Sequence, residues 1–269
     1  MFFKQFYDNN LSQASYLVGC QRTGEAIIID PVRDLTKYME VADSEGFTIT
    51  QAAETHIHAD FASGIRDVAE QLNANVYVSG EGDDELSYRN MPEQTHFVKH
   101  QDIIHVGNIK LEVLHTPGHT PESISFLLTD EGGGSSVPMG LFSGDFIFVG
   151  DIGRPDLLEK SVQMEGSTEV SAKQMYQSIE SVKDLPDYIQ IWPGHGAGSP
   201  CGKALGAVPM STLGYEKINN WAFNVTDESK FVETLTSNQP APPHHFAQMK
   251  KINQFGMKMY QPYNVYPSL

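Results

Sequence analysis

The sequence is short of cysteine and of positive charge, and each shortage excludes classes of protein. Its 269 residues include only two cysteines, Cys20 and Cys201, too few for a disulfide framework and in keeping with a reducing cytosol. Its 18 Lys and Arg residues stand against 34 Asp and Glu residues, which gives a formal net charge of −16. Such an acidic chain lacks the basic surface that attracts nucleic acids or anionic membranes, so we expect neither as a partner.

Long apolar runs are missing as well. The N-terminus begins Met1-Phe2-Phe3-Lys4 and lacks the basic start and apolar stretch of a signal peptide. The most apolar segment, residues 141–149, contains Asp145 and is far shorter than the roughly 18 residues of a membrane-spanning helix. We therefore expect a cytoplasmic protein with one large domain or two small ones.

What the chain does contain is an alternation of strand and helix patterns. We predict helices at residues 34–45, 63–73 and 170–182, and strands at 15–18, 26–29, 48–55, 109–114, 124–128, 141–148 and 188–192. From residue 212 the pattern is mostly helical, and a proline-rich segment at 239–243 precedes a basic helix around 248–254. The fold class is therefore α/β or α+β, rich in sheet and helical towards its C-terminus.

Four predicted strands end in turns that carry potential metal ligands. These turns are Thr55-His56-Ile57-His58-Ala59-Asp60, Thr116-Pro117-Gly118-His119-Thr120, Ser143-Gly144-Asp145 and Pro193-Gly194-His195-Gly196. Alternate residues at a strand end project to one side, so His56, His58 and Asp60 can face one cleft. A histidine taken alone is more often structural, and we give that role to His96, His100, His105, His115, His244 and His245, although His115 can also support a ligand. Four such turns in one chain instead indicate a metal site.

Together the four turns resemble the metallo-beta-lactamase superfamily, over most of the chain to about residue 200. The resemblance implies an αββα sandwich, in which two β-sheets lie face to face with helices outside and metal at one sheet edge. Dinuclear hydrolases of the superfamily carry His-x-His-x-Asp-His, whereas this sequence has Phe61 at the last position. A second ion would therefore keep only Asp60 and His195, with Asp145 as a bridge.

For a single ion, the resemblance to mononuclear members implies His56, His119 and Asp145 as the metal ligands. It leaves His58 and His195 outside the ligand set. Two histidines and one carboxylate with open positions form the facial triad of non-haem Fe(II) oxygenases. Zinc binds the same residue types, so the ligands alone do not decide the metal.

Three further segments resemble the persulfide dioxygenases, relatives of the ethylmalonic-encephalopathy protein, and in particular the branch fused to rhodanese domains. They are residues 150–157 (GDIGRPDL), 195–203 (HGAGSPCGK) and 211–217 (STLGYEK). The resemblance implies one Fe(II) per chain and sulfide detoxification, in which O₂ oxidises the terminal sulfur of a persulfide of coenzyme A, bacillithiol, glutathione or cysteine to sulfite. Fused members can convert the sulfite to thiosulfate. The family also suggests a homo-oligomer, a dimer or tetramer.

In this hypothesis Asp60, His58 and His195 orient the metal ligands and metal-bound water, and Asp60 is a catalytic candidate. Arg154 is a candidate for holding an anionic substrate through its planar donors. The alternative role for Arg154 is a structural ion pair with Asp151 or Asp156.

Cys201 is the second catalytic candidate. It lies six residues after His195 and close to Lys203, a cation that can lower the pKa of a thiol. We hypothesise that Cys201 borders the iron cleft and carries or receives a persulfide, the alternative being a small buried thiol. Cys20 is structural.

We place the dioxygenase domain at residues 1–237 and an extension towards a missing rhodanese-like domain at 238–269, because the chain contains no rhodanese nucleophile loop. Two other functions stay open. One is a zinc thioester hydrolase similar to glyoxalase II, against which Phe61 counts. The other is a non-catalytic module that presents a persulfide on Cys201.

Overall fold

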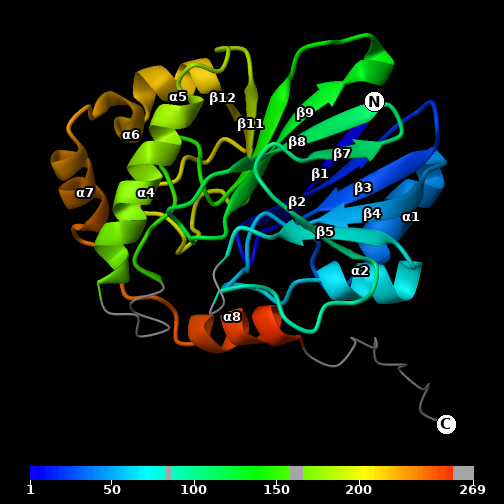
Figure 1. Cartoon of the computed structure of the whole chain (residues 1–269), viewed down its shortest axis with the longest axis horizontal. Helices are drawn as coiled ribbons and strands as arrows, with labels where there is room; N and C mark the ends of the chain where they lie inside the picture. Colours follow the sequence, from blue (N-terminus) through cyan, green and yellow to red (C-terminus); the bar gives the residue numbers. More distant parts are fainter. Residues whose placement is uncertain (83–85, 158–165, 257–269) are drawn as a thin grey trace.

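Two six-stranded sheets packed face to face form the centre of the protein, and helices cover their outer faces (Figure 1). This computed structural model describes residues 1–82, 86–157 and 166–256. The arrangement confirms the predicted αββα sandwich. Among the described residues, no helix is long and apolar enough to cross a membrane.

The first sheet is built by the N-terminal third of the chain. Its strands, in spatial order, are β1 (Phe2–Asp8), β2 (Gln13–Gly19), β3 (Glu25–Ile29), β4 (Thr48–Ala53), β5 (Asn75–Ser79) and β6 (Thr95–Val98). The first three pair antiparallel, and β3 to β6 pair parallel. Parallel neighbours need crossover connections, which α1 (Thr36–Glu45) and α2 (Ile65–Leu72) supply on the outer face.

The second sheet has the order β12-β11-β10-β9-β8-β7. Its strands are β7 (Ile103–Val106), β8 (Ile109–His115), β9 (Ile124–Asp130), β10 (Gly140–Gly144), β11 (Gln190–Pro193) and β12 (Ser211–Thr212). A tight hairpin turn at residues 107–108 joins β7 to β8. Because β10 and β11 pair parallel, their connection crosses over through α4 (Ser167–Val182).

The buried apolar side chains lie in three main layers. Tyr16, Phe126 and Trp192 belong to the layer between the two sheets. A second layer packs the first sheet against α1 and α2, and a third packs the second sheet against α4 and the C-terminal helices α5 (Leu213–Asn219), α6 (Trp221–Asn224) and α7 (Glu228–Thr236). The last helix, α8 (Phe246–Phe255), lies apart from these layers, below both sheets in the view of Figure 1.

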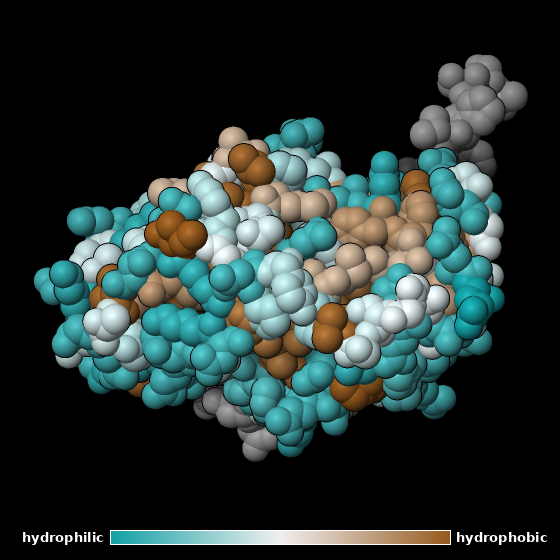
Figure 2. All heavy atoms as spheres, turned by 90° about the horizontal axis from the view of Figure 1, so that it is seen from above, coloured by the Kyte–Doolittle hydropathy of each residue, from teal (hydrophilic) through white to brown (hydrophobic). Residues whose placement is uncertain are grey.

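The face of the molecule seen in Figure 2 is mostly hydrophilic, with apolar residues gathered in several places on it. Large hydrophobic side chains are also exposed, among them Phe97, Val208 and Ile218. Exposed apolar side chains of this kind are ordinary in a globular protein.

One strand is shorter than its sequence predicts. The apolar run at residues 141–148 predicts a single strand, but β10 ends at Gly144. This glycine has a φ of 52°, and a Cβ there would lie 2.5 Å from the hydroxyl oxygen of Thr55. The chain therefore turns tightly against the neighbouring loop, and the turn carries Asp145 out of the sheet. Of the predicted extension at 238–269, residues 257–269 lie outside the described residues.

Candidate metal centre

The predicted ligands meet at one edge of the sandwich, in loops that follow β4, β8, β10 and β11. His56, His119 and Asp145 each bring one ligand atom within 4.8 Å of the other two, and all three residues are buried. The Asp145 Oδ2 atom lies 3.4 Å from His119 Nε2 and 3.8 Å from His56 Nε2. These are the three ligands that the resemblance to mononuclear enzymes implies.

Hydrogen bonds orient both histidine rings towards the aspartate. His119 Nδ1 lies 2.9 Å from the carbonyl oxygen of Arg154, which can only accept, so Nδ1 carries the proton. His56 Nδ1 lies 3.0 Å from the Thr55 hydroxyl, and that hydroxyl donates its own proton to Asp30. His56 Nδ1 is therefore a donor too. Both rings present the lone pair of Nε2, the atom a metal ion requires.

The group fits a metal ion in charge as well as in shape. Neither carboxylate oxygen of Asp145 accepts a hydrogen bond among the described residues, and buried polar atoms of this kind call for a further partner such as a metal ion. Burial lowers the pKa of His56 well below its ordinary value and also lowers the pKa of His119. Both histidines are therefore neutral near pH 7, which is the form that binds metal. We conclude that this is a metal-binding site.

A second group lies against the first. The ligand atoms of Asp60, His195 and Cys201 also fall within 4.8 Å of one another, and all three residues are buried. His195 Nε2 lies 3.2 Å from Asp60 Oδ2 and 3.4 Å from Asp145 Oδ1, while its Nδ1 lies 3.0 Å from the carbonyl oxygen of Ser12. Asp145 thus stands between the two groups and turns one oxygen towards each.

His58 belongs to neither group. Its Nε2 atom lies 3.3 Å from Asp30 Oδ1, and its ring packs on Phe61 with 4.4 Å between the ring centroids. Burial opposes protonation of this ring, yet the carboxylates of Asp30 and Glu54 raise the pKa of His58 to about 9. His58 is therefore protonated near pH 7 and forms an ion pair with Asp30.

Arg154 is committed to other protein groups. Its guanidinium makes two hydrogen bonds of 2.7 Å to Asp156 and donates to the carbonyl oxygens of Pro200 and Pro240. The residue has no exposed surface. The structure thus favours the ion-pair alternative for Arg154 over the substrate-binding role, although its backbone carbonyl orients His119.

The ionisation expected for Cys201 is wrong. Its pKa rises to about 12, because burial and the carboxylate of Asp145 disfavour the thiolate. The ammonium group of Lys203, expected to lower this pKa, instead donates to the carbonyl oxygens of Thr234 and Ser237. The thiol nevertheless lies beside the metal-binding group, as hypothesised from the sequence.

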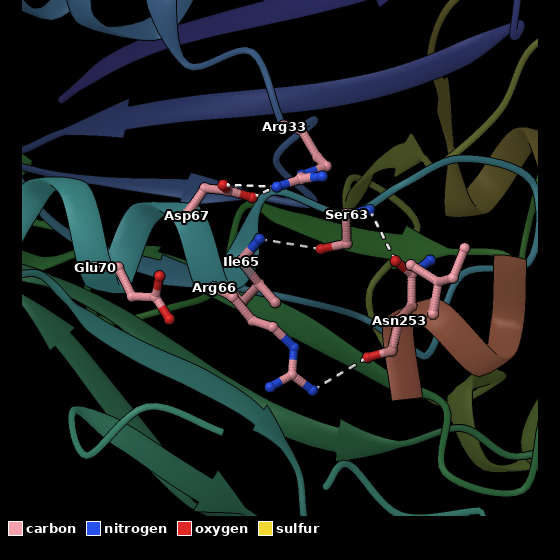
Figure 3. A pocket seen from close by; sticks show the side chains of 8 residues that line it. Arg33, Ser63, Ile65, Arg66, Asp67, Glu70 and Asn253 are labelled. Carbon is pink, nitrogen blue, oxygen red and sulfur yellow. Dashed lines mark hydrogen bonds and ion pairs between the residues drawn. The ribbon is translucent and has the colours of Figure 1, made fainter. Parts of the chain in front are cut away.

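Two residues on α8 support this site, and neither was predicted from the sequence. The side chain of Asn253 donates to the carbonyl oxygens of His58 and Phe61, both at 2.8 Å. It also accepts from the backbone N–H of Ser63 at 3.0 Å, a contact that is drawn in Figure 3. Lys250 Nζ lies 3.7 Å from Glu122 Oε1, the atom that accepts from the backbone N–H of Ile57. The C-terminal helix therefore holds the loop that carries His56 and Asp60.

Comparisons with known proteins agree with this geometry. The family model described as the Metallo-beta-lactamase superfamily matches residues 8–195. A hydroxyacylglutathione hydrolase from Dictyostelium discoideum is 29% identical over 265 residues, 96% of this chain and 87% of that protein. A metallo-beta-lactamase from Staphylococcus aureus subsp. aureus COL is 75% identical with a TM-score of 0.93, and the match covers 100% of this chain and 76% of that chain. ETHE1 from Myxococcus xanthus is 27% identical with a TM-score of 0.75, and the match covers 94% of this chain and 98% of that chain.

Proposed function

Since the chain belongs to the metallo-beta-lactamase superfamily, we propose that it is a non-haem Fe(II) persulfide dioxygenase. The observation that carries the proposal is the buried triad of His56, His119 and Asp145, a facial set of two histidines and one carboxylate. Phe61, which stands where dinuclear hydrolases have a histidine, packs on His58 and offers no ligand atom. The persulfide-dioxygenase motifs and the likeness to ETHE1 support the same function.

The reaction would convert R–S–SH, O₂ and H₂O into R–SH, SO₃²⁻ and two protons. The S–S bond breaks, and the terminal sulfur gives four electrons to O₂. Two of the sulfite oxygens come from O₂ and the third from water. When bound, Fe(II) would supply open positions for the sulfur and for O₂ and the electrons that activate O₂.

The residues of the chain have distinct tasks in this reaction. Neutral His56 and His119, with Asp145, would hold the ion on one side and leave the other side open. Asp60 and His195, 3.2 Å apart, are placed to hold water and to supply the proton that the departing thiolate needs. Apolar groups line the other side of Cys201 and keep bulk water away.

Oxygen uptake tests the proposal directly. Protein loaded anaerobically with Fe(II) should consume O₂ when glutathione persulfide or coenzyme A persulfide is added, and should release sulfite. His119→Ala should abolish both, whereas His105→Ala should not, because His105 is exposed on β7. Bound iron without O₂ uptake from any of the four persulfides would contradict the proposal.

A zinc thioester hydrolase is the second candidate, because the chain resembles a hydroxyacylglutathione hydrolase over 96% of its length. Zinc-loaded protein that hydrolyses hydroxyacylglutathione, together with inactive iron-loaded protein, would favour it. A non-catalytic persulfide carrier would instead keep its function in His119→Ala. The rhodanese-like partner, the homo-oligomer, the coupling to thiosulfate and the cytoplasmic location stay predictions.

A further inference from the structure

Lys250 is a buried cation whose hydrogen-bond donors the chain does not use. Its side chain is 5% exposed, and its Nζ atom makes one ion pair, with Glu122 Oε1 at 3.7 Å. That distance is too long for a hydrogen bond, and Nζ donates to no other group among the described residues. An ammonium group carries three N–H donors, and burial makes them costly to leave without acceptors. Lys250 can therefore donate to a further acceptor.

The ammonium group lies beside both loops that carry the histidine ligands. Its ion-pair partner Glu122 follows His119 by three residues and accepts from the backbone N–H of Ile57 at 3.2 Å. Ile57 is the neighbour of His56 in sequence. Burial is the first cause of the lowered pKa of both His56 and His119, and the charge of Lys250 contributes to both shifts. Lys250 therefore adds positive charge close to the metal centre.

One face of α8 holds Lys250 in this place. Phe246, Lys250 and Asn253 are buried and are spaced four and three residues apart, so they share one face of the helix. Phe246 packs with Cys201, and Asn253 donates to the loop after β4. These contacts fix the helix on both sides of Lys250. Lys251, the next residue, is exposed.

We propose that Lys250 binds the anionic terminal sulfur of the persulfide substrate at the metal centre. Ionised sulfur is the form that binds metal, so the substrate is taken as R–S–S⁻. A charge-assisted hydrogen bond to this anion is stronger than one to a neutral group. Lysine is a compact point charge, which suits a single sulfur atom better than a planar guanidinium does. The inference rests on the proposed function, and it gives Lys250 the anion-binding task that the sequence suggested for Arg154.

Thiocyanate is the probe, because it is a small anion with a terminal sulfur. When Co²⁺-loaded protein is titrated with thiocyanate in the absence of O₂, its visible absorption spectrum should change as the anion binds. Lys250→Met should weaken thiocyanate binding about 10-fold or more, because a hydrogen bond between charged groups is lost. The affinity for Co²⁺ should not fall, because the hydrogen bond from Ile57 to Glu122 does not involve the lysine. Lys251→Met is the matched control and should leave thiocyanate binding unchanged.

A double variant avoids the unpaired buried carboxylate that Lys250→Met leaves behind. Glu122→Gln keeps an oxygen that accepts from Ile57 and removes the negative charge, so Lys250→Met combined with Glu122→Gln buries no unpaired charge. This protein should fold and still bind thiocyanate about 10-fold more weakly. Glu122→Gln alone should bind thiocyanate at least as tightly as the original protein.

Three results would overturn the role of Lys250. They are an original protein that binds no thiocyanate, unchanged thiocyanate affinity in both lysine variants, and a loss of thiocyanate affinity matched by an equal loss of Co²⁺ affinity. The last result would show that the lysine only supports the ligand loop. The titration involves neither persulfide nor O₂, so failure of this inference and failure of the dioxygenase activity are measured separately. In the oxygen-uptake assay, Lys250→Met should raise the KM for the persulfide.

Discussion

The guanidinium of Arg154 joins three parts of the chain from inside the protein. It pairs with Asp156 and also binds the backbone at Pro200 and Pro240. In Arg154→Ala the buried carboxylate of Asp156 would lose this cation, so the free energy of unfolding should fall by about 3–5 kcal/mol. Urea denaturation followed by circular dichroism measures the change. Arg22→Ala, at an exposed position, should stay within about 0.5 kcal/mol of the original protein.

The same variant separates the two roles considered for Arg154. A structural role lowers the free energy of unfolding and leaves the KM for the proposed persulfide substrate unchanged in the folded fraction. Unchanged stability with a raised KM would instead show that this side chain holds the substrate.

Gly194 leaves room for the carboxylate of Asp145. A Cβ at this position would lie 2.7 Å from Asp145 Oδ1. The backbone cannot yield easily, because Gly194 donates to Gly144 and accepts from Ala14, both at 2.8 Å. Gly194→Ala should therefore displace the carboxylate and weaken metal binding about 10-fold or more, measured by competition with a chelator.

A second glycine of the same turn serves as the control. A Cβ on Gly196 would meet the hydroxyl oxygen of Tyr7 at 2.7 Å, but that side chain is 40% exposed and can turn away. Gly196→Ala should keep its metal affinity. Equal loss in both variants would mean that the turn is disturbed as a whole.

At the scale of elements, local patterns predicted the central strands and the helix ends well. The helix predicted to stop before Gly46 does so, and this glycine takes the left-handed conformation with a φ of 76°. β1 was not predicted, because FFKQFYD lacks alternating polarity; it forms by pairing along its full length with β2. Its stability comes from that neighbour, which the local sequence does not reveal.

The ligands of the site were predictable because each lies in a short, recognisable turn after a strand. The support from α8 was not. Asn253 binds the carbonyl oxygen of His58 across 195 positions of sequence, and no local pattern marks an asparagine for such a contact. The sequence also did not reveal the partners of the Arg154 and Lys203 side chains. These partners depend on which carbonyl groups and carboxylates the folded loops bring close to the two side chains.

The side chain of Asn253 connects α8 to the loop that carries His56 and Asp60 through three hydrogen bonds, of which Figure 3 shows the one to Ser63. Asn253→Ala should loosen the loop and reduce the affinity for Fe(II) or Co²⁺ about 10- to 100-fold, as losses of support behind metal ligands do. Chelator competition measures it. Gln248→Ala shortens an exposed amide on the same helix and should have no effect. Unchanged affinity in Asn253→Ala, with the fold retained, would refute this role.

At the scale of the whole molecule, the metal centre depends on both sheets. His56 and Asp60 follow a strand of the first sheet, whereas His119, Asp145 and His195 follow strands of the second. The ligands approach one another only when the two sheets pack, so a bound ion links the halves of the sandwich. Metal that binds only the folded protein raises its stability by mass action.

The C-terminal helix extends this dependence beyond the boundary that we predict at residue 237. Phe246 of α8 is buried together with Ala59, from the loop after β4, and Cys201, from the loop after β11. Lys250 and Asn253 of the same helix hold the loop after β4. A chain that ends at residue 237 would expose these contacts to water and leave the carbonyl oxygens of His58 and Phe61 without their shared donor.

We therefore expect the shortened chain to bind Co²⁺ at least about 10-fold more weakly than the full chain and to melt at a lower temperature. A titration and a thermal melt of both proteins measure this. If residues 1–237 instead keep full metal affinity and stability, they form the self-sufficient domain that the sequence predicts. That result would mean that α8 contacts the metal centre without supporting it, since removal of a structural support lowers the stability of the loop that it holds.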